Sequence, residues 1–411
     1  MSPLPWAASL SAVDRLETVR FIRAAHTAAQ AVAIEQRIYE SSTSREEYYA
    51  ACSSAAKNPT ASAVDTSSDT RVSGPTQPRV RIGAWHDCEF VSEGVTSRVY
   101  RSGDSALKVI VARAPLEPHN PQREANILRR LRPPCIPLLD VFRDHEQRLV
   151  LRFPYLPLTL SQLIVGRAIS LPQLRTIVND TLRALEAIHG QGIIHRDIKP
   201  SAILVASADG PAFLSDFGTA WHPELCQSSE PAHRKILDIG TGPYRAPEVL
   251  FANRSYGPPV DMWGLGVIIA EAINAPPRPL FESRPAHEDG NQLGLILSIF
   301  KTIGTPTRET WPEADGFPVS PFELWTVFPA RPWEEILPNV DKQFRELVAA
   351  LVRFDGRRVT AAQVRICLIW IPSGADSVAG SQVSVLVGMR RCGTVGIRVY
   401  PEVEALVLEY A

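Results

Sequence analysis

The stretch His195–Ala202, which reads His-Arg-Asp-Ile-Lys-Pro-Ser-Ala, places one carboxylate and three basic groups within eight residues. Asp197 can accept the proton of a hydroxyl group, and the charge of Lys199 can neutralise an anion that approaches the same place. Asp216 follows in the tripeptide Asp-Phe-Gly, and its carboxylate is a hard oxygen ligand suited to a divalent cation. Two carboxylates and a lysine in these motifs are candidates for an active-site loop, and the alternative is a surface loop with a chance ion pair.

A second pair of charges lies upstream. Lys108 ends the strand-like tripeptide Ala-Leu-Lys, and Glu124, sixteen residues later, opens a segment with helical apolar periodicity. Their separation predicts an ion pair between a strand and a helix. Strand-like patterns over 88–111 and 147–156 come before a long predicted helix, Leu171–His189, and largely helical patterns follow Asp261. Strands first and helices later indicate the α+β class.

Taken together, these motifs resemble those of eukaryotic Ser/Thr protein kinases over about 88–365. Seven of the eight residues of His195–Ala202 match that family's catalytic loop. Tyr244–Glu248 and the insert-like stretch Pro279–Pro312 are most similar to cyclin-dependent kinases, particularly the fungal kinases that activate them. The resemblance implies a two-lobed protein kinase fold over 84–365, with a small β-rich N-lobe over about 84–153 and a larger helical C-lobe over about 157–365.

The resemblance also implies the cofactors, ATP and Mg²⁺, and a protein substrate whose Ser or Thr hydroxyl is phosphorylated. It gives these roles at the phosphate end: Asp197 as base, Lys199 as cation beside the γ-phosphate, Thr241 bonding both, Lys108 as phosphate anchor, Glu124 as its orienter and Asp216 as metal ligand. Around the nucleotide it gives the degraded glycine loop with Gly94, the adenine-facing Val91, Val99, Ala106 and Leu204, and a hinge with Phe153 as gatekeeper, then Tyr155 and Leu156.

Two structural ties follow from the same resemblance. Glu248, at the end of the activation segment, is expected to pair with a buried arginine late in the domain, and Arg358 is the best placed candidate. Asp261 is expected to hold the backbone of the catalytic loop.

Ala202 departs from the family, which has a metal-binding Asn at this position. Three readings compete. The protein is an active enzyme slowed by the loss of one ligand, or a pseudokinase that serves as a nucleotide-binding scaffold or allosteric partner, or an ordinary kinase whose Ala202 is a strain-specific change or sequence error. A non-functional truncated product is a remote further alternative. Because Asp197, Lys199 and Asp216 are retained, the slowed enzyme is the favoured reading.

Regulatory positions depart as well. Ile236 stands where related kinases carry a phosphorylated Thr. Of the three arginines that clamp the phosphate in those kinases, Arg123 and Arg196 are present by position, and the third is replaced by Trp221. Activation by loop phosphorylation is therefore not expected, unless Ser228 or Ser229 substitutes. The segment Pro118–Glu124 keeps only the final Arg-Glu of the cyclin-binding sequence, which puts cyclin dependence in doubt.

Composition limits the remaining possibilities. The 411 residues carry a formal net charge of −1, so no global field favours nucleic acid or an anionic membrane as a partner. The six cysteines are scattered, the start lacks a signal-peptide pattern and the apolar runs are too short to span a bilayer. We expect reduced thiols and a cytoplasmic or nuclear location.

The two ends differ from the middle of the chain. Residues 1–79 are interpreted as a helical extension over 10–40 followed by a disordered linker over 41–78, rich in Ser, Thr, Ala and Pro. Residues 366–411 alternate Gly, Val and Ser with little helical periodicity, and we interpret them as an atypical tail. One hypothesis is that this tail is a misread exon boundary or a degenerate end.

Overall fold

The structure is a computed structural model that describes residues 79–112, 116–282, 292–323 and 326–369, together with part of an N-terminal segment between residues 18 and 57. The first half of the domain contains β1 (Val80–Ile82), β2 (Trp85–Glu93), β3 (Ser97–Ser102), β4 (Ser105–Ile110), α4 (Pro121–Leu128), β5 (Asp140–Arg143), β6 (Leu149–Pro154), β7 (Leu158–Thr159), α5 (Leu160–Val165) and α6 (Leu171–His189). The second half contains η2 (Pro200–Ala202), β8 (Ile203–Val205), β9 (Ala212–Leu214), η3 (Phe217–Thr219), η4 (Gly242–Tyr244), α7 (Pro247–Leu250), α8 (Pro259–Ile273), α10 (Leu293–Ile303), η5 (Pro312–Gly316), α11 (Trp333–Ile336), α12 (Lys342–Leu351) and α13 (Ala361–Ile369).

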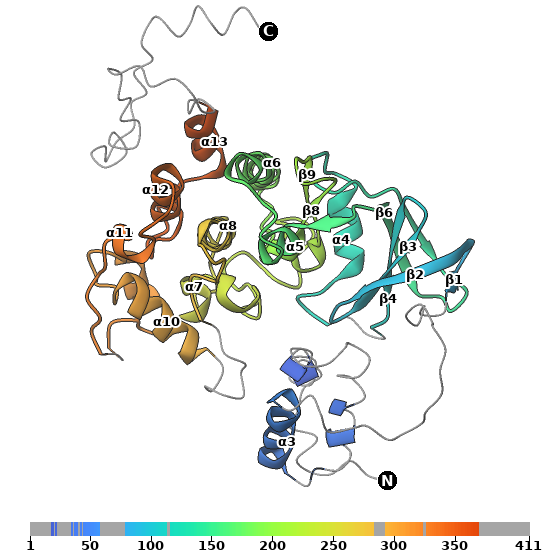
Figure 1. Cartoon of the computed structure of the whole chain (residues 1–411), viewed down its shortest axis with the longest axis horizontal. Coiled ribbons are helices and arrows are strands. Elements are labelled where there is room, and N and C mark those ends of the chain that lie inside the picture. Colours follow the sequence, from blue (N-terminus) through green and yellow to red (C-terminus); the bar gives the residue numbers. More distant parts are fainter. Residues whose placement is uncertain are drawn as a thin grey trace, which may run out of the picture. The chain divides into compact units, whose positions relative to one another are not determined.

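The N-lobe is a six-stranded antiparallel sheet in the order β1-β2-β3-β4-β6-β5, with α4 beside it (Figure 1). Strand β4 shows how the sheet places the side chain of Lys108 on the face opposite the core. Successive side chains of a strand point to opposite faces, so Leu107 and Val109 enter the core while Ala106 and Lys108 face the other way. Helix α4 begins where Asn120 caps its first turn, with the side-chain oxygen accepting from the Arg123 amide at 2.9 Å.

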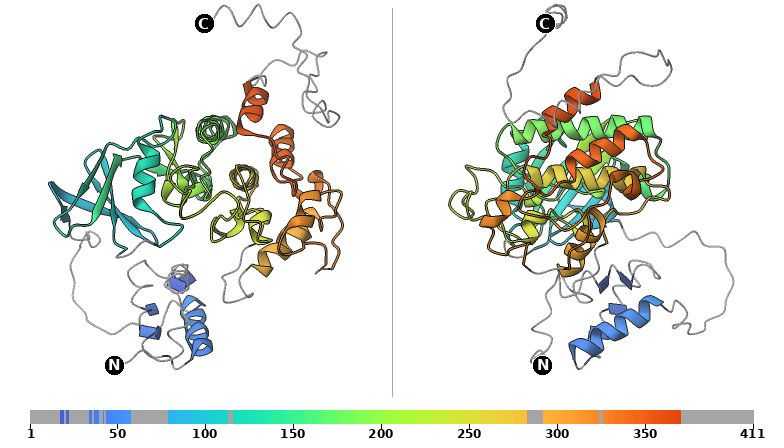
Figure 2. Two further views of the ribbon diagram at one scale, coloured as in Figure 1. Left: turned by 180° about the vertical axis from the view of Figure 1, so that it is seen from behind. Right: turned by 90° about the vertical axis from the view of Figure 1, so that its left-hand side faces the viewer.

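The C-lobe is helical. Helix α6 starts at a reciprocal capping box between Ser170 and Gln173, and α8 lies against both α6 and α12 (Figure 2). Helix α8 is buried almost along its whole length, as its continuous apolar sequence requires. Gly264 of α8 matters for the site, because a Cβ at this position would lie 2.8 Å from the carbonyl oxygen of Ile198. The glycine therefore lets α8 approach the catalytic loop.

These elements confirm the predicted α+β, two-lobed architecture. A small sheet, β7-β8-β9, accompanies the C-lobe helices. No helix within the described ranges is both long and apolar enough to cross a membrane.

The expectation of a disordered linker over 41–78 was wrong in its first part. Helix α3 spans Arg45–Lys57, with Ser44 accepting from the Glu47 amide at 3.1 Å at its start. Its Tyr48 and Cys52, one turn apart, are buried with Val19 and Ile22. The Ser- and Ala-rich composition concealed this apolar pair. Residues 58–78 lie outside the described residues.

Helix α13 spans Ala361–Ile369 and therefore crosses the predicted start of the atypical tail at 366. Thr360 starts this helix, with its hydroxyl accepting from the Gln363 amide at 3.3 Å and the Gln363 side chain accepting from the Thr360 amide at 2.9 Å. Once nucleated, a helix extends through residues of moderate propensity. Residues 370–411 lie outside the described residues.

Candidate active site

The catalytic loop is held from below by Asp261, as the sequence predicts. One carboxylate oxygen accepts from the backbone amide of Arg196 at 2.8 Å and the other from that of His195 at 2.9 Å. The ring of His189 lies 2.9 Å from the second oxygen. Burial alone would raise the pKa of Asp261, but the hydrogen bonds and the two histidines outweigh it and lower the pKa. The loop is thus anchored to α8 by an ionised carboxylate.

The predicted base and its neighbours lie together. Thr241 donates its hydroxyl to one oxygen of Asp197 at 2.6 Å, and Lys199 bonds the other oxygen. Lys199 also donates to the Thr241 hydroxyl at 3.3 Å. Asp197 is buried, so these contacts fix the carboxylate in one orientation rather than leaving it to solvent. A carboxylate fixed in this way can accept a proton from a substrate hydroxyl that comes within hydrogen-bond reach.

Lys108 joins the two lobes at the other side of the site. Its ammonium group lies 2.7 and 2.9 Å from the two oxygens of Glu124 and 3.0 Å from an oxygen of Asp216. Burial opposes the charge of Lys108, yet the two carboxylates raise its pKa. Lys108 in turn lowers the pKa of Asp216, whereas burial raises the pKa of Glu124. The lysine therefore stays charged beside an ionised Asp216.

The backbone of the site adopts two left-handed conformations at residues other than glycine. Arg196 has φ of 72° and Asp216 has φ of 62°. Such conformations are unfavourable for residues with a Cβ and persist where the surrounding contacts demand them. Here both residues are held by side-chain contacts on each side of the loop, and the conformation directs the Asp216 carboxylate towards Lys108.

A cleft of about 90 Å³ collects the phosphate-side residues. Of the predicted site residues it is lined by Gly94, Lys108, Glu124, Asp197, Lys199 and Asp216. Lining residues that the sequence did not single out include Thr96, Ser97, Ile110, His119 and Asn120. A second, larger hollow of about 680 Å³ over Val80–Gly83 and the strands beside it shares no residue with this cleft. The charged cleft is the chemically competent one.

The predicted adenine and hinge residues lie outside the lining of this cleft. Ala106 of β4 pairs in register with Phe153 of β6, Val99 of β3 pairs with Lys108, and Leu204 lies on β8. Val91 is 44% exposed on β2. The amide of Tyr155 is already used, donating to the Asp104 carbonyl at 2.8 Å, so the hinge offers the Pro154 carbonyl and the Leu156 backbone instead.

His119 was missed by sequence reasoning. It precedes α4 and faces Lys108, Asp216, Asp197 and Lys199 across the cleft. Burial is the main cause that lowers its pKa, so its imidazole is neutral at physiological pH. The signal available in the sequence was its position five residues before Glu124, at the entry to the helix.

The thinned glycine loop keeps its turn without its glycines. The Gly94 amide donates to the Ser97 carbonyl at 2.8 Å, which closes the turn between β2 and β3. A Cβ at Gly94 would meet no atom nearer than 3.7 Å, so even the surviving glycine is not demanded by space.

Ala202 contributes no ligand, but its backbone is structural. The side chain is buried, and its carbonyl accepts from both the amide and the hydroxyl of Ser215 at 2.8 Å. Over the described part of the chain no group of three or more His, Cys, Asp or Glu side chains is arranged to hold a metal ion. Mg²⁺ is commonly held by one or two carboxylates together with phosphates and water. Asp216 therefore fits one such ion, and a second ion lacks its ligand.

The predicted tie at the end of the activation segment is confirmed. Arg358 donates from one guanidinium nitrogen to Glu248 at 2.8 Å and from the other at 2.5 Å, and it lies over the Trp263 ring at 4.9 Å from the centroid. The bidentate geometry makes this a strong, oriented pair.

Comparison with known proteins shows the family to which the chain belongs. The model of the protein kinase domain family matches residues 86–366. Serine/threonine-protein kinase csk1 of Schizosaccharomyces pombe is 35% identical over 281 residues, which are 66% of this chain and 89% of that protein. A chain of the CAK complex from Chaetomium thermophilum bound to ATP-gamma-S superposes with a TM-score of 0.57 at 30% identity, covering 67% of this chain and 88% of that one. A chain of the yeast RNA Pol II CTD kinase CTDK-1 complex gives a TM-score of 0.57 at 25% identity, covering 72% and 95%.

Proposed function

Because this chain belongs to the protein kinase family and is a serine/threonine kinase related to the cyclin-dependent group, we propose that it transfers the γ-phosphate of ATP to hydroxyl groups of a protein. The proposal rests on one observation above all. Asp197 and Lys199, which are hydrogen-bonded to each other and to Thr241, line the same cleft as Lys108 and Asp216.

Each residue of the cleft has a task that its contacts permit. Asp197 accepts the proton of the substrate hydroxyl, and Thr241 keeps its carboxylate oriented. Lys199 places its charge where the migrating phosphoryl group becomes most negative, and Lys108 holds the other phosphates. Glu124 fixes the position of Lys108. Mg²⁺ on Asp216 would supply charge neutralisation of the phosphates.

Ala202 sets the rate rather than the reaction. Removing one electrostatic contact to a transition state typically costs about 10²–10³ in rate. The remaining cations, Lys108 and Lys199, are both in place, so a slowed enzyme is the reading we favour. The alternative is a pseudokinase that binds nucleotide as a scaffold, and the specific observation in its favour is the missing ligand at Ala202.

We further propose that no cyclin is needed to orient the helix α4. The Lys108–Glu124 pair is closed in the chain by itself, with Glu124 buried. A cyclin that acts by turning α4 inward would form no additional Lys108–Glu124 contact, because this ion pair is already present. The chain purified alone should therefore show the same phosphotransfer rate with and without added cyclin.

One experiment tests the proposed function. Mg-ATP binding is measured by thermal shift, and phosphotransfer to a generic basic protein is measured for the wild type, Ala202→Asn and Asp216→Ala. The slowed-enzyme reading predicts nucleotide binding by the wild type, a gain of about 10²–10³ in rate for Ala202→Asn and no transfer by Asp216→Ala. An Asn variant no faster than a silent wild type leaves only the pseudokinase, and a wild type that binds no nucleotide rejects both.

A further inference from the structure

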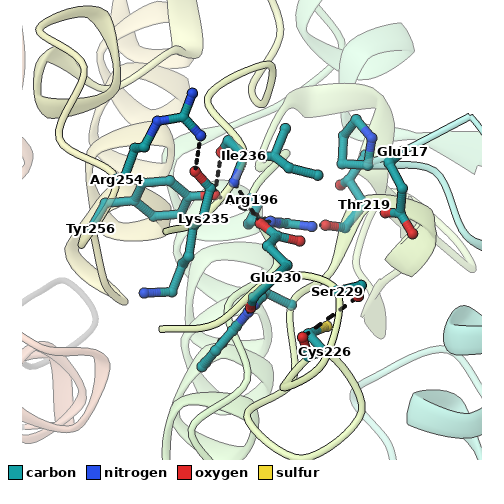
Figure 3. Close-up of polar contacts among 12 residues, drawn as sticks. Glu117, Arg196, Thr219, Cys226, Ser229, Glu230, Lys235, Ile236, Arg254 and Tyr256 are labelled. Atoms are coloured by element: carbon teal, nitrogen blue, oxygen red, sulfur yellow. Dashed lines mark hydrogen bonds and ion pairs between the residues drawn. The ribbon is translucent and has the colours of Figure 1, made fainter. Parts of the chain in front are cut away.

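A buried ion pair joins the catalytic loop to the activation segment, and the proposed reaction does not use this pair directly. Arg196, the residue before the base Asp197, directs its guanidinium at the carboxylate of Glu230 (Figure 3). The Arg196 side chain is 0% exposed and that of Glu230 is 2% exposed. A buried guanidinium requires an anion and hydrogen-bond acceptors, since either charge alone would be strongly unfavourable. Glu230 thus supplies the negative charge that balances Arg196 of the catalytic loop.

Glu230 also organises the segment in which it lies. The carboxylate oxygen that meets Arg196 accepts the backbone amide of Ile236 at 2.7 Å (Figure 3). The Glu230 carbonyl accepts from the Trp221 indole at 2.8 Å. One residue therefore joins the catalytic loop, the start of the activation segment and the position where related kinases carry a phosphorylated Thr.

Tyr256 closes the arrangement from the C-lobe. Its hydroxyl donates to the Ile236 carbonyl at 2.6 Å and lies 3.1 Å from a guanidinium nitrogen of Arg196. Nε of Arg196 donates to the Thr219 carbonyl, whereas the second terminal nitrogen of Arg196 is buried without a hydrogen-bond partner among the described residues. Arg196 is consequently held in place on several sides, and the backbone of the adjacent Asp197 is held with it.

The charges match a carboxylate rather than a phosphate. A phosphate carries about −1.5 to −2 and needs several arginines. Of the clamp arginines expected from the family, Arg123 instead pairs with Glu117 at 3.1 Å and bonds the Pro118 carbonyl, and the third position is Trp221. One arginine therefore meets one carboxylate. Ser228 and Ser229, the candidate substitutes for the missing Thr, are exposed.

We propose that Glu230 is a positioning residue that takes the place of the activation-loop phosphate, so that the kinase is active without loop phosphorylation. The proposal rests on the proposed phosphotransfer activity. Glu230 acts through Arg196, which orders the catalytic loop at Asp197, and through the Ile236 amide, which orders the activation segment. Phosphorylation of Ser228 or Ser229 could reach the fully buried Arg196 only by displacing Glu230.

The test compares charge with shape at one position. Glu230→Gln keeps the size and removes the charge, whereas Glu230→Asp keeps the charge in a shorter side chain. Ser228→Ala/Ser229→Ala is the matched control, and the wild type is assayed before and after phosphatase treatment. The measurements are kcat, KM for ATP, melting temperature and hydrogen exchange of the Ile236 amide.

The charge role predicts that Glu230→Gln lowers kcat about 10- to 100-fold, the scale of a small misplacement of catalytic groups. The KM for ATP should stay within about twofold, because the Lys108 contacts are separate. Glu230→Asp should retain more activity than Glu230→Gln. The serine variant and the phosphatase-treated wild type should keep full kcat. If Glu230 had a structural role alone, the substitutions would lower the melting temperature, but kcat would not be higher in Glu230→Asp than in Glu230→Gln.

Three results would overturn the proposal: an unchanged kcat in Glu230→Gln, higher activity in Gln than in Asp, or loss of wild-type activity on phosphatase treatment. The phosphatase arm needs no variant, so it decides even where substitutions prevent folding. If the wild type shows no phosphotransfer, the proposed function is rejected instead. Hydrogen exchange of the Ile236 amide then tests the role of Glu230. Faster exchange at Ile236 in Glu230→Gln than in the serine variant supports the role of Glu230, and equal exchange rejects it.

Discussion

Replacing Arg358 by methionine should remove a large share of the stability of this domain. The Arg358 side chain is 0% exposed and its two terminal nitrogens bond both oxygens of Glu248. It also donates to the carbonyls of Pro259 and Arg353 at 3.0 and 2.8 Å. Methionine fills most of the volume, so the cavity is small and the electrostatic loss dominates.

The magnitude follows from what is left behind. An unpaired Glu248, 10% exposed, remains in a low-dielectric site, and breaking one partner of a buried pair typically costs about 3–5 kcal/mol. Against a total stability of roughly 5–15 kcal/mol this is a large fraction. At about 2–4 °C per kcal/mol, the melting temperature should fall by roughly 6–20 °C.

Urea denaturation and thermal melting of the purified chain measure the effect. The matched control is the double variant Glu248→Leu/Arg358→Met, which leaves no unpaired charge. It should be less destabilised than the sum of the two single variants by at least about 2 kcal/mol. The reasoning is refuted if Arg358→Met loses less than about 1 kcal/mol, or if the double variant simply equals that sum.

Three further predictions concern protonation. Lys108→Met should lose stability relative to the wild type as pH rises above about 4.5, because burial raises the pKa of Glu124 and the variant lacks the Lys108 charge that opposes this increase. Urea denaturation at pH 4 and pH 8 measures the effect, and the same difference in unfolding free energy between variant and wild type at both pH values would contradict it. Asp261 has a lowered pKa, so its ionised carboxylate stabilises the fold above about pH 3.8 and loses this effect as pH falls. The difference in unfolding free energy between the wild type and Asp261→Asn should therefore become smaller in acid. Burial raises the pKa of Cys135 to about 12, so iodoacetamide at pH 8 should spare this thiol in the native protein and alkylate it in urea, as read by peptide mass.

Local sequence motifs predicted more of the site than of its surroundings. Lys108, Glu124, Asp197 and Asp216 could be identified because they stand in motifs that match protein kinases, and all four line one cleft. His119 was missed, since its position five residues before Glu124 is the sole signal in a loop that diverges from the family. The early part of the supposed linker was misjudged because two buried residues of α3, Tyr48 and Cys52, are outnumbered by small polar ones.

The sequence by itself determined the fold class, the charged residues that line the cleft and the lack of a side-chain metal ligand at Ala202, since each depends on residue types in motifs that match the protein kinase family. Only the tertiary structure decided the partners of the regulatory residues. Arg196 and Glu230 are 34 positions apart, and no local pattern links them. Their pairing exists because folding removes both from water, where each charge then needs the other.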